Sequence, residues 1–141
     1  MPRLPSLTRL TPALLLALAA CTAARPETPG PDPRLVARVT ASAAEQVKRC
    51  YQAPRVVREA RSAREIVTRL RVRYLPDGQL ADYPELLSQA NITAANRAHA
   101  PAMAEAAMIA VVRCVPLVLP PELYQAGWSE FELTFSPRKI A

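Results

Sequence analysis

Cysteine and histidine have the widest chemical repertoire in this sequence, and both are scarce. The chain has three cysteines and one histidine, His99. No two cysteines form a Cys-x-x-Cys pair, and His99 is too distant from them to give the ligand spacing of a zinc site. Three glycines leave little scope for a phosphate-binding loop, and we find no Ser/His/Asp set. The sequence therefore predicts a binding module that is not an enzyme and needs no cofactor or metal.

Cys21 follows a short apolar segment with a basic start. Arg3 and Arg9 precede the run ALLLALAA at residues 13–20. This run is shorter than the stretch of about 20 apolar residues that spans a bilayer, so it predicts a signal peptide that is removed on export. The alternative is an ordinary secretory signal that happens to contain a cysteine. In either case the mature protein is expected to work outside the cytoplasm.

The four residues Leu18-Ala19-Ala20-Cys21 resemble the lipobox of bacterial lipoproteins. The resemblance implies that residues 1–20 are cleaved off and that Cys21 receives the lipid. Thr22 follows the cysteine, and the absence of aspartate there resembles lipoproteins that are exported to the outer membrane. The expected location is the periplasmic side of the cell envelope, with the outer membrane favoured over the inner one.

Once Cys21 is assigned to lipid, one cysteine pair remains. In an oxidising periplasm, Cys50 and Cys114 are predicted to form a disulfide. The bridge would close a long loop, and the chain-entropy model then gives a stabilisation of about 4 kcal/mol.

Arginine supplies nearly all of the positive charge. The formal net charge of +6 falls to +4 when Arg3 and Arg9 leave with the signal peptide, and Lys48 and Lys139 are the only lysines. A basic exported protein is expected to meet anionic lipid headgroups or acidic proteins, and not nucleic acid. No small-molecule substrate is predicted.

Two segments follow the signal peptide. Residues 21–33 are rich in proline and poor in large apolar side chains, which predicts a semi-rigid tether behind the lipidated cysteine. Residues 34–141 are predicted to form one domain.

Two helices of this domain are predicted from apolar residues at helical spacing. The first spans about 34–50, and the second begins near Pro101 and ends at Arg113 or Cys114. Each internal cysteine closes the apolar stripe of a helix, which supports pairing across the core. Residues 52–65 are expected to be an irregular, arginine-rich connection.

Three strands are predicted from alternation with a period of two. The first begins at Thr68, the turn Pro76-Asp77-Gly78 leads into the second at about 79–87, and the third spans 130–136. The outward charges are Arg69, Arg71 and Arg73 on the first strand, and Glu130 and Glu132 on the third. Opposite charges favour these two strands as neighbours. The predicted fold is α+β, in the order α-β-β-α-β, with a small three-stranded antiparallel sheet in the order 2-1-3 and helices packed on one face.

Several segments together carry a family resemblance. They are Val47-Lys48-Arg49-Cys50-Tyr51, Leu75-Pro76-Asp77-Gly78, Cys114-Val115-Pro116-Leu117 and Phe131-Glu132-Leu133-Thr134-Phe135-Ser136-Pro137. Over about residues 40–138 the chain resembles the C-terminal domain of TolA and its relative in TonB, and it is closer to TolA. Family members often have tryptophan where this chain has Tyr51. Family members also have an N-terminal membrane helix and a long stalk. We expect neither in this sequence, which argues against a role in force transduction.

The resemblance implies that the domain binds envelope proteins, with Tol or Ton components as candidates, by adding a partner strand to an exposed sheet edge. Glu130, Glu132 and Thr134 mark that edge on the third strand, unless they are only its solvated face. A second hypothesis makes Arg69, Arg71 and Arg73, with the arginines of 55–64, a docking patch for anionic lipid or lipopolysaccharide. Charge runs are also often plain solvated surface.

Overall fold

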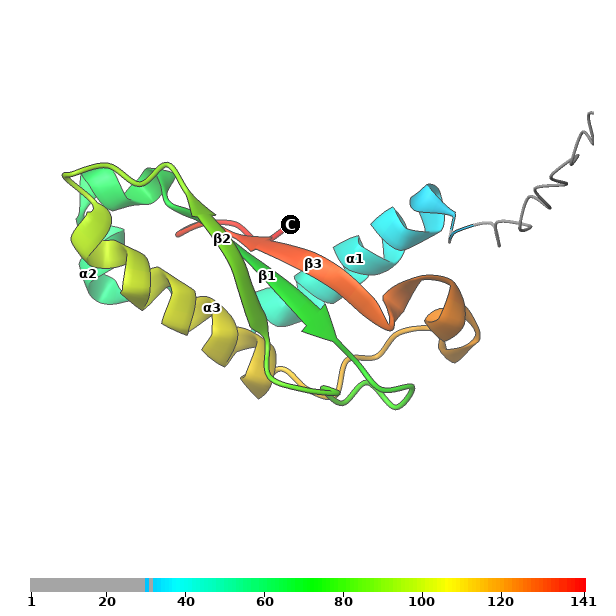
Figure 1. The fold of residues 1–141 in the computed structure, drawn as a ribbon. Helices are drawn as coiled ribbons and strands as arrows, with labels where there is room; N and C mark the ends of the chain where they lie inside the picture. Colours follow the sequence, from blue (N-terminus) through cyan, green and yellow to red (C-terminus); the bar gives the residue numbers. More distant parts are fainter. Residues whose placement is uncertain (1–29, 31) are drawn as a thin grey trace, which may run out of the picture.

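The computed structural model describes residue 30 and residues 32–141. The predicted signal peptide, Cys21 and most of the predicted tether lie outside the described residues. The described chain forms one antiparallel sheet of three strands, and helices pack on one of its faces (Figure 1). The strand order is β2-β1-β3, so the α+β class and the predicted order 2-1-3 are confirmed.

Helices α1 (Pro33–Lys48) and α3 (Ala100–Arg113) cover the sheet; α1 packs against β3, and α3 against β1 and β2. The carboxylate of Asp32 accepts a hydrogen bond from the Arg34 N–H at 2.9 Å and so caps α1. Pro33 occupies the first turn, where no backbone N–H is required. The buried faces of the two helices include Val39, Ala43 and Val47 in α1, and Met103, Ala107 and Val111 in α3.

Strand β1 (Val67–Arg73) is central, with β2 (Glu85–Ala90) on one side and β3 (Glu130–Phe135) on the other. Leu70 lies opposite Leu133, and Val72 lies opposite Phe131. All four side chains are buried under the helices. The alternation in the sequence therefore identified the core face of both strands correctly.

The second strand begins later than predicted. After an isolated bridge between Tyr74 and Leu80, the chain leaves the ladder and re-enters it only at Glu85, so the prediction of 79–87 was wrong for residues 79–84. Pro84, which has no N–H to donate, lies directly before the strand. The side chain of Asp82 turns back to Arg73 in this intervening loop.

The connection at 52–65 is also more regular than predicted. It contains the short helix α2 (Arg55–Glu59) and the 3-10 turn η1 (Arg61–Glu65). Val57 and Ala63 are buried there and pack with Ile66 and Met103 in a second, smaller apolar cluster. Elements of five residues are too short to display a helical period, which explains why no helix was predicted there.

The predicted disulfide is present and joins the ends of the two main helices. The Cα atoms of Cys50 and Cys114 lie 5.6 Å apart. Tyr51, the next residue, packs edge-on against Phe135 with 5.4 Å between ring centroids, and its hydroxyl donates to the Ser136 carbonyl at 3.0 Å. Tyr51 contacts both apolar clusters, so the end of α1 is fixed by a covalent bond and by an aromatic anchor.

Replacing both Cys50 and Cys114 with Ser should lower the free energy of unfolding by about 4 kcal/mol, because the unfolded chain regains the freedom of a long loop. Urea denaturation of the oxidised protein and the double variant measures the difference. Reduction of the unaltered protein should give a similar loss. A loss well under about 1 kcal/mol in both cases would contradict a structural role for the bridge.

Gly78 is fixed in a left-handed conformation, with φ of 81°. Its carbonyl accepts a hydrogen bond from the Leu117 N–H at 2.9 Å, and a Cβ at this position would overlap the Leu117 carbonyl. Gly78→Ala should therefore cost about 2 kcal/mol or more of stability, from backbone strain and steric overlap together. Gly30→Ala is the matched control, since no atom of the described residues lies within 4 Å of a Cβ there. Equal melting temperatures for the two variants would refute this explanation.

Candidate functional site

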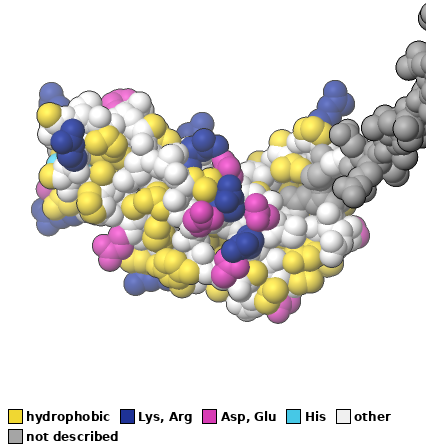
Figure 2. Space-filling view, viewed as in Figure 1, with side chains coloured by type: hydrophobic (Ala, Val, Ile, Leu, Met, Phe, Trp, Pro, Cys, Tyr) yellow, Lys and Arg dark blue, Asp and Glu magenta, His cyan; other side chains and the backbone are white. Residues whose placement is uncertain are grey.

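The solvent face of the sheet carries a lattice of paired charges. Figure 2 shows Lys/Arg and Asp/Glu side chains intermixed over the sheet. Arg71 lies at the centre, 3.3 Å from Glu85 of β2 and 3.6 Å from Glu130 of β3. Arg69 pairs with Glu132, and Arg73 approaches Asp82 at 2.9 Å. The arginines of β1 thus meet the glutamates of β3 across the ladder, as the charge pattern predicted.

This lattice leaves no excess of positive charge on the sheet. Arg69, Arg71 and Arg73 face four carboxylates, from Glu85, Glu130, Glu132 and Asp82. The hydrogen bond from Arg73 to Asp82 raises the pKa of that guanidinium, so it stays charged and paired. An anionic lipid surface would meet these carboxylates together with the arginines.

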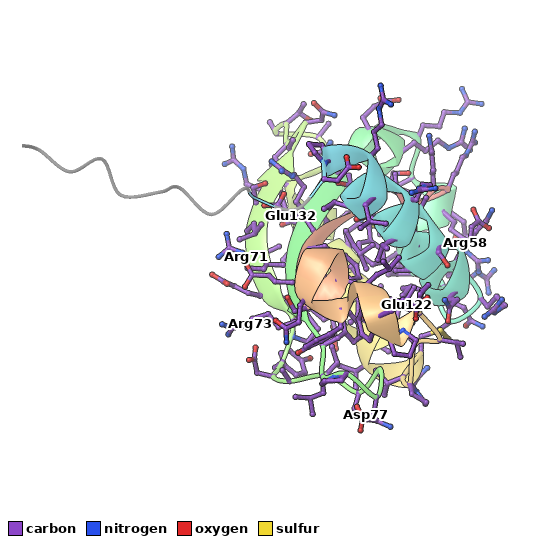
Figure 3. All side chains as sticks on the ribbon, turned by 90° about the vertical axis from the view of Figure 1, so that its right-hand side faces the viewer. Arg58, Arg71, Arg73, Asp77, Glu122 and Glu132 are labelled. Carbon is purple, nitrogen blue, oxygen red and sulfur yellow. A yellow bond between two sulfur atoms is a disulfide. The ribbon has the colours of Figure 1, made fainter. Side chains whose placement is uncertain are left out.

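Arg55 and Arg58 do not extend this surface, because both line a hollow with Lys48 and Arg138. Arg58 lies on α2, and Figure 3 places it on the opposite side of the molecule from Arg71 and Arg73. The single arginine cluster suggested by the sequence is therefore two separate surfaces. The two groups are close in sequence, but α2 and β1 are separate elements with η1 between them.

The outer edge of β3 exposes backbone groups at alternate residues. The Tyr74 N–H donates to the Ser129 carbonyl at 2.9 Å, so Ser129 and every second residue after it bond to β1. The N–H and C=O groups of Glu130 and Glu132 consequently point away from the sheet. Among the described residues, neither has a backbone partner on that side. This short stretch of β3 is an open hydrogen-bonding edge.

Thr134, the third residue of the predicted binding edge, differs from the two glutamates. Its N–H donates to the Ala141 carbonyl at 2.6 Å, and the Ala141 N–H donates back to the Thr134 carbonyl at 2.9 Å. The Ser136 N–H donates to the Lys139 carbonyl at 2.7 Å. Residues 139–141 therefore already occupy this half of the edge, and the open half is confined to Glu130 and Glu132.

The opposite edge of the sheet, along β2, is less regular. Leu70 pairs with Leu86 while Arg69 pairs with Ser88, so Leu87 is bulged out of the ladder. A bulge twists an edge and disrupts the spacing of its outward groups, as does a proline just before the strand. Of the two edges, β3 offers the flatter template.

Two aromatic residues before β3 are structural. Trp128 is fully buried, and its indole N–H donates to the Pro120 carbonyl at 2.7 Å. The Tyr124 hydroxyl donates to the Tyr74 carbonyl at 2.8 Å, and the two rings of Tyr124 and Trp128 pack edge-on. They fix the approach to β3, and so its register, and do not form a binding surface.

Within residues 30 and 32–141, no three His, Cys, Asp or Glu side chains are grouped closely enough to hold a metal ion. No helix of that part of the chain is long and apolar enough to span a membrane. Searches of family models, curated proteins and solved structures find no match for this chain.

Arg71→Gln should cost about 0.5–1 kcal/mol of stability at low salt, because it removes the centre of the charge lattice. The cost should shrink in high salt, where exposed pairs are screened. Denaturant unfolding at two ionic strengths measures both values. Arg97→Gln, on an exposed arginine without an ion pair among the described residues, should change little at either salt concentration. A cost for Arg71→Gln that is independent of salt would contradict an electrostatic origin.

Proposed function

We propose that this protein is a lipid-anchored adaptor of the bacterial envelope, whose domain binds an extended segment of a partner protein by strand addition. The observation that carries the proposal is the open edge of β3, where the N–H and C=O groups of Glu130 and Glu132 have no backbone partner among the described residues. An incoming strand would satisfy these groups and extend the sheet by one strand.

The construction of β3 supports this role. The strand is held on its inner edge by β1 and on its core face by Phe131 and Leu133, which are buried. Trp128 anchors the residues before it. A rigid edge loses little entropy when a partner strand pairs with it, so more of the interaction energy appears as affinity.

Two features of the sequence support the cellular setting. The resemblance of 18–21 to a lipobox supports lipid on Cys21, and the similarity to the TolA C-terminal domain supports an envelope protein as the partner. The disulfide between Cys50 and Cys114 is of a kind that persists in oxidising compartments such as the periplasm. Tol or Ton components are the candidates to test first, with the outer membrane favoured as the anchoring surface.

The proposed mode of binding depends on the backbone of β3 and not on its carboxylates. Glu130 and Glu132 are engaged with Arg71 and Arg69 on the solvent face. Their side chains are therefore perpendicular to the edge that a partner would use. A docking role for Arg69, Arg71 and Arg73 on anionic lipid is the weaker candidate, since each is paired with a carboxylate.

Proline substitutions can test which of the two sheet edges binds the partner. Glu132→Pro removes an N–H that points outward from β3 and leaves the ladder to β1 bonded, because only alternate residues contribute to it. We expect recovery of the bound envelope protein to fall about tenfold or more, through loss of the pairing across the edge. The measurement is a quantitative pull-down from detergent-solubilised envelopes.

Leu86→Pro is the matched control, because the Leu86 N–H points outward from the β2 edge. It should leave recovery unchanged, and circular dichroism should show both variants folded. Hydrogen exchange at the amides of Glu130 and Glu132 should slow when partner is bound. Full recovery with Glu132→Pro, or a loss with Leu86→Pro instead, would reject β3 as the docking edge.

A further inference from the structure

We infer that a hollow between α1, α2 and the segment after β3 is a binding site for a phosphate-bearing anion. The hollow has a volume of about 630 Å³, within the range of small-molecule sites. Four cationic residues line it, from three separate parts of the chain, and no acidic residue does: Lys48, Arg55, Arg58 and Arg138. This site is distinct from the open edge of β3 and does not depend on strand addition.

Two of the four cations lack any ion pair among the described residues. Lys48 lies 3.7 Å from Glu45, and Arg55 lies 2.6 Å from Glu59. Arg58 and Arg138 have no such neighbour, and both are exposed at the hollow. This differs from the sheet, where every β1 arginine meets a carboxylate. The hollow therefore presents two cations that no carboxylate of the described residues compensates.

The wall of the hollow is held firmly. Tyr51 lies between the disulfide at Cys50 and the ring of Phe135, and its hydroxyl is bonded to the Ser136 carbonyl. Burial raises the pKa of Tyr51 to about 12, so the phenol stays neutral and adds no negative charge to the wall. Pro54 and Pro137 line two other sides with restricted backbone. The cations therefore project from a fixed frame.

Phosphate suits this arrangement better than a carboxylate does. Guanidinium groups bind phosphate oxygens through paired N–H donors, and a doubly charged anion can use several cations at once. The hollow is also larger than a bare phosphate ion, which leaves room for an organic group such as glycerol or a sugar. The ligand could be a soluble phosphate ester or the phosphate of a lipid headgroup, and the two sources share this recognition chemistry.

The test uses the full chain with Cys21→Ser, so that no lipid on this residue contributes to membrane binding. The probes are glycerol 3-phosphate, followed by amide NMR shifts, and sedimented vesicles of phosphatidic acid mixed with phosphatidylcholine. The double variant Arg58→Gln/Arg138→Gln should bind about tenfold or more weakly, since each lost charged hydrogen bond has a large effect. Arg97→Gln/Arg113→Gln removes the same charge from exposed positions away from the hollow and should bind normally.

The outcomes separate the sources and the alternatives. Glycerol 3-phosphate binding that shifts Gln52 and Arg58 and needs the hollow's arginines supports a soluble ester as ligand. Vesicle binding with the same dependence, and no effect of glycerol 3-phosphate, supports a lipid headgroup. No binding of either probe overturns the site. Equal weakening by the two double variants also overturns it, because that result reflects net charge alone. Strand addition at β3 is unaffected by any of these results.

Discussion

Strand β1 is bonded on both edges and covered on one face, and this constraint determines the rest of the fold. The side chains of Leu70 and Val72 point into the core, and their backbone groups bond to β3, whereas the side chains of Arg69 and Arg71 point to solvent, and their backbone groups bond to β2. Along a strand, successive side chains point to opposite faces of the sheet, and successive N–H and C=O groups point to opposite edges. Residues of β1 that face the core are therefore the ones whose backbone bonds to β3. A slip of one residue would bury three arginines, so the register of all three strands is fixed by this one segment.

The sequence was most informative where a signal is local and repeated. The alternating strand at Thr68 and the apolar stripes of the two helices predicted the class, the opposite charges of two strands predicted the strand order, and the cysteine count predicted the disulfide. The ion pair between Arg71 and Glu130 could also be predicted, because side chains of opposite charge on adjacent strands stabilise their pairing. These features depend on residues a few positions apart or on simple pairwise chemistry.

The features that could not be predicted depend on contacts between segments that are brought together only by the fold. Thr134 looked equivalent to Glu130 and Glu132, yet its backbone is bonded to Ala141, a contact that follows from the turn at 136–139. The hollow beside Tyr51 could not be predicted, because Lys48, Arg58 and Arg138 come from separate segments that meet only in the folded chain. The arginines of 55–73 seemed one cluster, but short helical elements of five residues, invisible to periodicity, divide them.

The bulge at Leu87 has a consequence for how many molecules can join through the sheet. Growth of a fibre by edge pairing needs two compatible edges on every copy, one to receive and one to offer. Here one edge is regular over a short stretch and the other is interrupted by the bulged residue just after Pro84. Copies of this sheet are therefore not expected to join edge to edge into a fibre. The irregular β2 edge, and not the regular β3 edge, thus limits self-association through the sheet.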